Sequence, residues 1–167
     1  MKKGILTGLA AILAAGSLYL PVNASNYNEF GQYGRPGYLV MGDSDEQIAE
    51  EIRLGEMELV AQLVQAEAGN QPFEGKCLVV DVILNRVESP LFPNTIEEVI
   101  FDDGQFSVIK NGAFDKAAWN MDEETYRAVE YEFAMHENKE VLYFNNNSHV
   151  AGTGKKFKVG GHWFRNG

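Results

Sequence analysis

One acidic residue lies on the apolar face of a helical segment. In residues 56–68, the spacing of Val60, Val64 and Glu67 places all three on one side of an expected helix. An ionised carboxylate is costly to bury, and both burial and the negative end of a helix raise its pKa. A raised pKa lets a carboxyl group act as a general acid near neutral pH. Glu67 is therefore the candidate catalytic residue; the structural alternative is a Glu67 that reaches solvent or pairs with Arg53 or Arg86.

The cysteine and the histidines give weaker indications of chemistry. Cys77 is the single cysteine, so no intramolecular disulfide can form, and its apolar run at 77–80 predicts a small buried core residue. His136, His149 and His162 are each 13 residues apart, which is not a zinc-ligand spacing. We therefore expect no metal site, and no residue pattern indicates a cofactor.

The elements that must position Glu67 are mostly helical. Ser44 and Gln47 form a capping-box pattern that begins a helix, Gly55 is expected to break or kink it, and a second helix ends at Gly69-Asn70. The remaining expected elements are helices at 73–88, 95–101 and 122–138, an irregular stretch at 102–121, a strand at 141–144 and a hairpin at 156–165. The predicted fold class is α+β, mostly α, with a small β element late in the chain.

The composition indicates one globular domain with an uneven charge. The chain has 167 residues, 45% of them apolar, and a formal net charge of −10, so it lacks the basic footprint of a nucleic-acid-binding protein. Residues 139–167 nevertheless hold five basic residues against one acidic residue. This region is either a basic hairpin on an otherwise acidic surface or a positive edge that attracts an anionic polymer. We expect the protein to be a monomer.

The first residues have the pattern of an export signal. Lys2 and Lys3 precede an apolar run over 5–20, and small or branched residues over 21–24 suit cleavage after Ala24. We predict a signal peptide at 1–24, a flexible linker at 25–42 and a catalytic domain at 43–167. The alternative is an uncleaved anchor, for which the run is short. Either alternative implies export to the cell wall or beyond, and the processed chain would keep no stable membrane span.

Several short segments occur together in one order over about 105 residues. They are the segments 66–69, 72–76, 82–87, 89–96, 99–101, 105–107, 142–145 and 161–165, which read AEAG, PFEGK, VILNRV, SPLFPNTI, VIF, QFS, LYFN and GHWFR. In this order and spacing, residues 60–165 resemble the catalytic domain of the bacterial spore-cortex-lytic and related cell-wall hydrolases. That family has the lysozyme-like fold.

The resemblance implies cleavage of peptidoglycan at the β-1,4 bond between N-acetylmuramic acid and N-acetylglucosamine. The family's catalytic glutamate matches Glu67. The family further implies a lytic transglycosylase, in which this carboxyl protonates the leaving oxygen and then accepts the proton of the muramyl 6-hydroxyl. One alternative is a muramidase that uses water and a second carboxylate, for which the candidates are Glu74, Asp81, Asp102 and Asp103. The other is a peptidoglycan-binding protein without turnover.

Five further residues are candidates for substrate binding. Gln105 and Phe106 follow a glycine in the irregular stretch, where binding residues often occur. Tyr143 and Asn145 offer a ring face and an amide to sugar acetamides, and His162 completes the set. Core packing is the alternative role of Phe106, Tyr143 and His162.

The sequence departs from the family's usual pattern at two places. Asn70-Gln71 stands where the family often has a second acid, and Asn145-Asn146 stands where it usually has Asn-Pro. We expect these changes to alter the tuning of the site and the shape of the loop after the strand. Asn85 and Arg86, at the end of the central helix, are expected to be structural, with Asn85 satisfying backbone groups.

Overall fold

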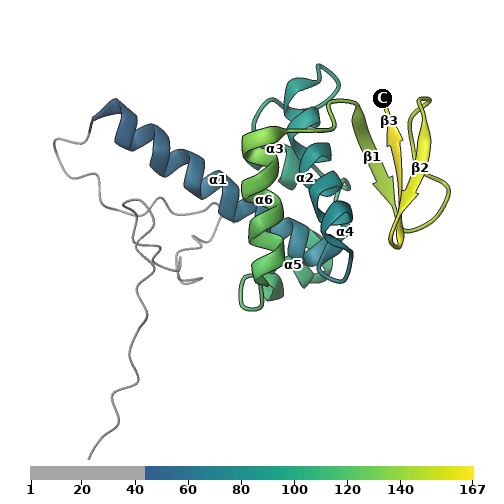
Figure 1. Cartoon of the computed structure of the whole chain (residues 1–167), viewed down its shortest axis with the longest axis horizontal. Helices are drawn as coiled ribbons and strands as arrows, with labels where there is room; N and C mark the ends of the chain where they lie inside the picture. Colours follow the sequence, from purple (N-terminus) through teal and green to yellow (C-terminus); the bar gives the residue numbers. More distant parts are fainter. Residues whose placement is uncertain (1–43) are drawn as a thin grey trace, which may run out of the picture. The chain divides into compact units, whose positions relative to one another are not determined.

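The computed structural model describes residues 44–167, which form a helical body with a small sheet beside it (Figure 1). The predicted signal peptide and linker lie outside the described residues. In chain order the elements are α1 (Asp45–Ala68), α2 (Phe73–Glu88), α3 (Ile96–Phe101), α4 (Ser107–Asn111), α5 (Ala113–Ala117), α6 (Glu123–Met135), β1 (Val141–Asn145), β2 (Lys156–Val159) and β3 (His162–Asn166). Within 44–167, no helix combines the length and the apolar character that a membrane span requires.

Helix α1 is one continuous helix of 24 residues, so the predicted break at Gly55 is wrong. The capping box at its start is confirmed, because the Ser44 side chain accepts from the backbone of Gln47 and the Gln47 side chain accepts from the backbone of Ser44. A single glycine costs a helix only about 1 kcal/mol, which the rest of a long helix can offset. Burial begins only at Met57, so Gly55 lies near the boundary between an exposed half and a packed half.

Helix α2 is the central helix, and its predicted bounds are confirmed. It follows Pro72, whose missing N–H costs nothing at a helix start, and eleven of its sixteen residues are buried. It packs against α1, α3, α6 and β1. The Asn85 side-chain amide donates to the backbone oxygens of Asn138 and Val141, at 2.7 and 2.8 Å, which confirms its structural role.

The stretch at 102–121 contains two short helices, α4 and α5, where the sequence predicted irregular chain. Gly112 separates them with φ 75°, a left-handed conformation that glycine adopts without strain. Each helix has five residues, too few for a helical period to be recognised. Their buried side chains, Val108, Phe114 and Ala117, nevertheless anchor both helices to the body.

Helix α6 begins with the Asp122 side chain as its cap and ends three residues before the expected position. Of the side chains expected to face inward, Val129 is buried, whereas Tyr126, Phe133 and His136 are half-buried. His136 ends the helix in a left-handed conformation with φ 42°.

The three strands form an antiparallel sheet in the order β1-β3-β2, which confirms the predicted strand and hairpin (Figure 1). Paired residues project to the same side of such a sheet. The inner side holds Phe144, Phe157, Val159, His162 and Phe164; the outer side holds Tyr143, Asn145, Lys156, Lys158, Trp163 and Arg165. Phe164 is fully buried and stacks on Phe144 and Phe157, so the inner side is the packed one.

Candidate active site

Glu67 lies in the last turn of α1 and is half-buried. Burial raises the pKa of its carboxyl, and a hydrogen bond from the backbone N–H of Val108 partly opposes that rise. Val108 is in the first turn of α4, where N–H groups have no partner within the helix. The carboxyl therefore has the environment of a general acid, with one donor that stabilises its ionised form after proton transfer.

Neither arginine of the structural alternative pairs with Glu67. Arg53 forms its salt bridge with Glu50, at 2.8 Å. Arg86 directs its Nε to the backbone oxygen of Leu142, at 3.0 Å, and its guanidinium lies over the rings of Phe92 and Phe106. The surroundings of Glu67 are thus those of a partly buried carboxyl without a salt bridge to either side chain.

Phe106 joins the start of α4 to the sheet. Its ring is buried, lies 5.2 Å from the Arg86 guanidinium and packs against Phe144 at 6.3 Å between centroids. Because Phe106 is the residue at the N-cap of α4, this packing fixes the helix start whose N–H contacts Glu67. Phe106 therefore has a packing role at the start of α4, two residues before Val108.

The other candidate binding residues do not gather at one place. His162 is buried on the inner side of the sheet against Phe144 and Phe164, and burial lowers its pKa. Gln105 is exposed in the turn before α4. Tyr143 and Asn145 lie on the outer side of the sheet, opposite to His162.

Gln71 makes a contact that the sequence did not predict. Its side-chain oxygen accepts a hydrogen bond from the backbone N–H of Gly161, at 2.6 Å. The contact joins the α1–α2 turn, four residues after Glu67, to the β2–β3 turn. A Cβ at Gly160 would lie 2.7 Å from the Pro72 ring, and φ there is 55°, so this turn favours glycine. The only sequence signal was the replacement of the family's acid at 70–71.

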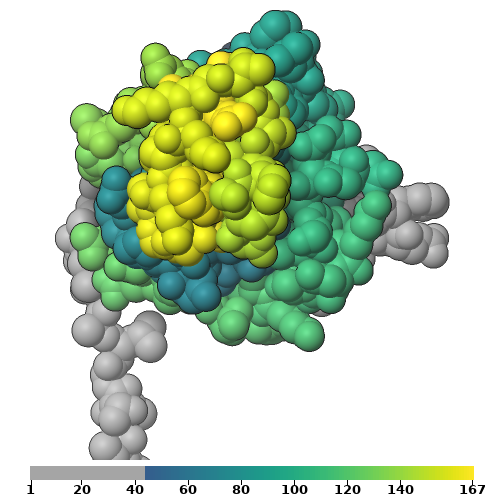
Figure 2. Space-filling view, turned by 90° about the vertical axis from the view of Figure 1, so that its right-hand side faces the viewer, coloured from purple at the N-terminus to yellow at the C-terminus, as the bar shows by residue number. Residues whose placement is uncertain are grey.

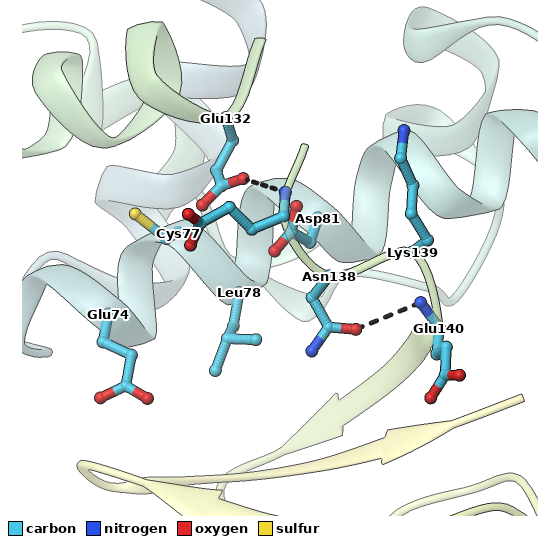
Figure 3. Close-up of a pocket in the computed structure, with 9 residues that line it drawn as sticks. Glu74, Cys77, Leu78, Asp81, Glu132, Asn138, Lys139 and Glu140 are labelled. Carbon is cyan, nitrogen blue, oxygen red and sulfur yellow. Dashed lines mark hydrogen bonds between the residues drawn. The ribbon is translucent and has the colours of Figure 1, made fainter. Parts of the chain in front are cut away.

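A second group of carboxylates lies between α2 and α6 (Figure 3). A cavity of about 540 Å³ is lined there by Glu74, Cys77, Leu78, Asp81, Glu132, Glu137, Asn138, Lys139 and Glu140. Burial and the neighbouring Glu132 raise the pKa of Asp81 to about 8. Burial and Glu132 also raise the pKa of the Cys77 thiol above its usual range, and Cys77 is buried as predicted. Glu67 does not line this cavity.

The four residues considered for a second catalytic carboxylate lie in different parts of the structure. Glu74 and Asp81 belong to the α2–α6 cavity, and Asp103 pairs with Lys110 on the surface. Asp102 ends α3. None of the four is among the groups that shift the pKa of Glu67. In the part of the chain that the structure describes, no three His, Cys, Asp or Glu side chains form a group that could hold a metal ion.

A mostly helical body, a three-stranded sheet beside it and a half-buried glutamate at a helix end together define the lysozyme-like fold. The chain belongs to the Cell Wall Hydrolase family, which matches residues 70–165. It is 44% identical over 57 residues to a spore cortex-lytic enzyme of Bacillus subtilis, covering 34% of this chain and 19% of that protein. A spore cortex-lytic enzyme of Oceanobacillus iheyensis is 34% identical over 85 residues, which are 51% of this chain and 31% of that protein.

Two solved structures have the same fold. The catalytic domain of the Bacillus cereus SleB protein matches with a TM-score of 0.55 and 29% identity, over 68% of this chain and 91% of that one. The catalytic domain of the germination-specific lytic transglycosylase SleB from Bacillus anthracis matches with a TM-score of 0.54 and 26% identity, over 75% and 98%. The chain thus aligns with nearly all of each catalytic domain but with less than a third of either curated relative.

Proposed function

We propose that this protein cleaves peptidoglycan between N-acetylmuramic acid and N-acetylglucosamine as a lytic transglycosylase, with Glu67 as its catalytic acid and base. The observation that carries this proposal is the half-buried Glu67 carboxyl at the end of α1, whose pKa is raised by burial, with no carboxylate among the groups that shift it. Membership of the Cell Wall Hydrolase family and similarity to spore cortex-lytic enzymes support peptidoglycan as the substrate.

In this mechanism one carboxyl performs both proton transfers. Protonated Glu67 donates to the bridging oxygen as the glycosidic bond breaks, and the Val108 N–H stabilises the carboxylate that results. The carboxylate then takes the proton of the muramyl 6-hydroxyl while that oxygen bonds to C1, which closes a 1,6-anhydro ring. Glu67 is again protonated and no water enters the product. A muramidase would instead need a carboxylate about 5–9 Å away to position water or form a covalent intermediate.

Digestion of purified sacculi in water enriched in oxygen-18 tests the reaction type. A transglycosylase should release anhydro-muropeptides, lighter than the hydrolysis product by one water and free of the heavy oxygen. Heavy oxygen at most new reducing ends would instead assign the muramidase reaction. If the protein is folded and the sacculi nevertheless stay intact, it is a peptidoglycan-binding protein without turnover.

The Glu67→Gln variant tests the assignment of the residue. It keeps the size and hydrogen-bonding capacity of the side chain but cannot donate a proton as an acid. We expect turbidity loss of sacculi to slow by about 10²–10⁴-fold, the usual contribution of a general acid, with an unchanged circular dichroism spectrum. Lysis at more than about a tenth of the wild-type rate would contradict the role of Glu67.

The same proposal includes export. The substrate lies outside the cytoplasmic membrane, and residues 1–24 have the charge and hydropathy pattern of a signal peptide. Mass spectrometry of the protein recovered from the culture medium or wall fraction should give a mature chain that begins at Ser25. Recovery of the unprocessed chain with the membranes would support an uncleaved anchor.

A further inference from the structure

The outer side of the sheet gathers cations around one aromatic ring. Lys158, Trp163 and Asn145 form a row across β2, β3 and β1 through direct strand pairing, and Lys156 lies diagonally next to Trp163. The Lys156 and Lys158 ammonium groups lie 5.2 and 5.6 Å from the centroid of the Trp163 ring. We call these four residues the cationic sheet face; they belong to the C-terminal segment shown in yellow in Figure 2.

In the described part of the chain, the two lysines of this face share with several other surface cations the lack of a carboxylate partner, and Lys156 donates only to the backbone oxygen of Ser148, at 3.3 Å. Arg53, Lys76 and Lys110 each form a salt bridge with a carboxylate. Within residues 44–167, no carboxylate forms a salt bridge with Lys156 or Lys158, although the whole chain has 24 acidic residues and a net charge of −10. Two like charges held over one ring repel each other, and an anion between them would relieve that repulsion.

The neighbouring side chains fit a carbohydrate that bears such anions. Trp163 is half-buried and Asn145 is half-buried beside it, while both lysine side chains are exposed. An indole ring offers an apolar face to a sugar ring, and a side-chain amide can both donate to and accept from an N-acetyl group. The remaining outer residues are less accessible, because Gly152 packs against the Tyr143 ring and accepts a hydrogen bond from Arg165.

We propose that the cationic sheet face binds a peptidoglycan strand through the carboxylates of its peptide stems, in addition to the contacts around Glu67. The inference rests on the proposed function for the identity of the polymer, and charge complementarity carries it: an anionic strand meets the unpaired cations of an acidic protein. Cleavage by Glu67 and retention on the wall are then separate tasks of separate residues. His162 and Phe144 are on the inner side; Trp163 and the two lysines are on the outer side.

Binding is best measured on a chain that cannot cut its ligand. The assay is co-sedimentation of the mature Glu67→Gln protein with sacculi stripped of phosphate polymers. Adding Lys156→Gln and Lys158→Gln together should raise the dissociation constant about 10-fold. The matched control is Lys110→Gln with Lys116→Gln, which removes the same charge from exposed lysines of α4 and α5 and should change binding less than about 2-fold. Raised salt should weaken the binding of the parent Glu67→Gln chain to sacculi and leave the binding of the Lys156→Gln, Lys158→Gln variant nearly unaffected.

The chemistry of the ligand is tested by changing the wall. Amidation of the stem carboxylates should weaken the binding of the parent chain to sacculi to the level shown by the variant without Lys156 and Lys158. Trp163→Ala should also weaken binding, and Trp163→Phe should restore most of it, which separates the role of the ring from loss of folding.

Three results would overturn the inference. The first is an equal loss of binding in the Lys156/Lys158 variant and the Lys110/Lys116 control. The others are unchanged binding of the parent chain to amidated sacculi, and binding only to sacculi that keep their phosphate polymers. Failure of wild-type protein to lyse sacculi would instead count against the proposed function, and it is measured separately.

Discussion

At the scale of the residue, the state of Glu67 is set by a few neighbours that come from distant parts of the chain. The helical period predicts that it lies beside Val60 and Val64; both valines are buried, and Glu67 is half-buried in the same helix. The opposing donor, the Val108 N–H, could not be predicted, because it depends on where the short helix α4 begins. The pKa of Glu67 is thus a product of tertiary packing as much as of its place in α1.

The raised pKa of Glu67 predicts a pH-dependent stability difference. A carboxyl whose pKa is higher in the folded state costs stability once the pH exceeds its unfolded value of about 4.5, and that cost is complete above the folded pKa. Glu67→Gln removes the cost. Urea unfolding should therefore show the variant to be more stable than wild type at pH 7, with the difference shrinking toward pH 4. A difference that does not change with pH would contradict the burial of the carboxyl.

Cys77 is expected to matter for packing and not for chemistry. It is buried, and burial keeps its thiol protonated by raising the pKa. Cys77→Ala should leave sacculus lysis unchanged and lower the free energy of unfolding by on the order of 1 kcal/mol, because a small cavity remains. Urea unfolding and a turbidity assay check both statements. Rapid labelling of the native thiol with loss of lysis would show that the residue has a reactive role.

At the scale of the elements, Asn85 connects three of them. Its amide nitrogen donates to backbone oxygens of Asn138 and Val141, and its oxygen meets the Nε2 of His136 at 2.8 Å, so α2, the end of α6 and β1 share one side chain. Asn85→Ala should lower the free energy of unfolding by about 1–3 kcal/mol, since buried carbonyls lose their donor. Asn85→Asp keeps only the acceptor and should be at least as damaging. A change within about 0.5 kcal/mol would refute the bridging role.

The contact of α2 with α6 also predicts a loss of stability between acid and neutral pH. Asp81 is 1% exposed, one of its oxygens has no hydrogen-bond partner, and burial with Glu132 raises its pKa to about 8 from an ordinary 3.8. The unfolded chain loses this proton above its ordinary pKa and the folded chain keeps it up to about pH 8, so stability falls between these values and is constant above them. In urea unfolding, the advantage of Asp81→Asn over wild type should therefore grow from about pH 4 to about pH 8 and then level off. Glu132→Gln removes the neighbouring charge and should reduce the same pH dependence; an unchanged profile in both variants would contradict the coupling.

The sequence predicted long elements better than short ones. Helices α2 and α3 and the hairpin follow from periodicity, caps and Gly160-Gly161, all of which are local signals. The break at Gly55 was predicted from one residue's propensity, which the rest of α1 outweighs. Helices α4 and α5 depend on burying Val108 and Phe114 against the body, a tertiary effect that five-residue segments do not reveal.

Local sequence patterns identified Glu67 but did not predict how the candidate binding residues are arranged. Glu67 was identified by a face of a helix and by the family pattern. Tyr143 and Asn145 were chosen for the ring face and the amide that they offer to a sugar, and His162 was added to them, but strand alternation places His162 on the opposite side of the sheet from the other two. Their separation, and the contact of Gln71 with Gly161, become visible only once the strand register is known.

At the scale of the whole molecule, the first helix of the described residues has a complete N-terminal cap. The capping box of Ser44 and Gln47 satisfies the first backbone groups of α1, and the buried residues of that helix begin only at Met57. The sheet, α2 and Glu67 all lie later in the chain. The domain predicted for residues 43–167 is therefore expected to fold and act without the residues that precede it.

A shortened chain of residues 44–167 tests this expectation. It should give the helical circular dichroism of the mature protein, the same urea midpoint within error and the same rate of sacculus lysis. A second shortened chain that begins at Met57 lacks the cap and the exposed half of α1, and should lose about 1 kcal/mol of stability because its helix start has no side-chain acceptor. Failure of the 44–167 chain to fold, beside an active mature protein, would show that residues before Ser44 belong to the catalytic domain and would move its boundary toward the signal peptide.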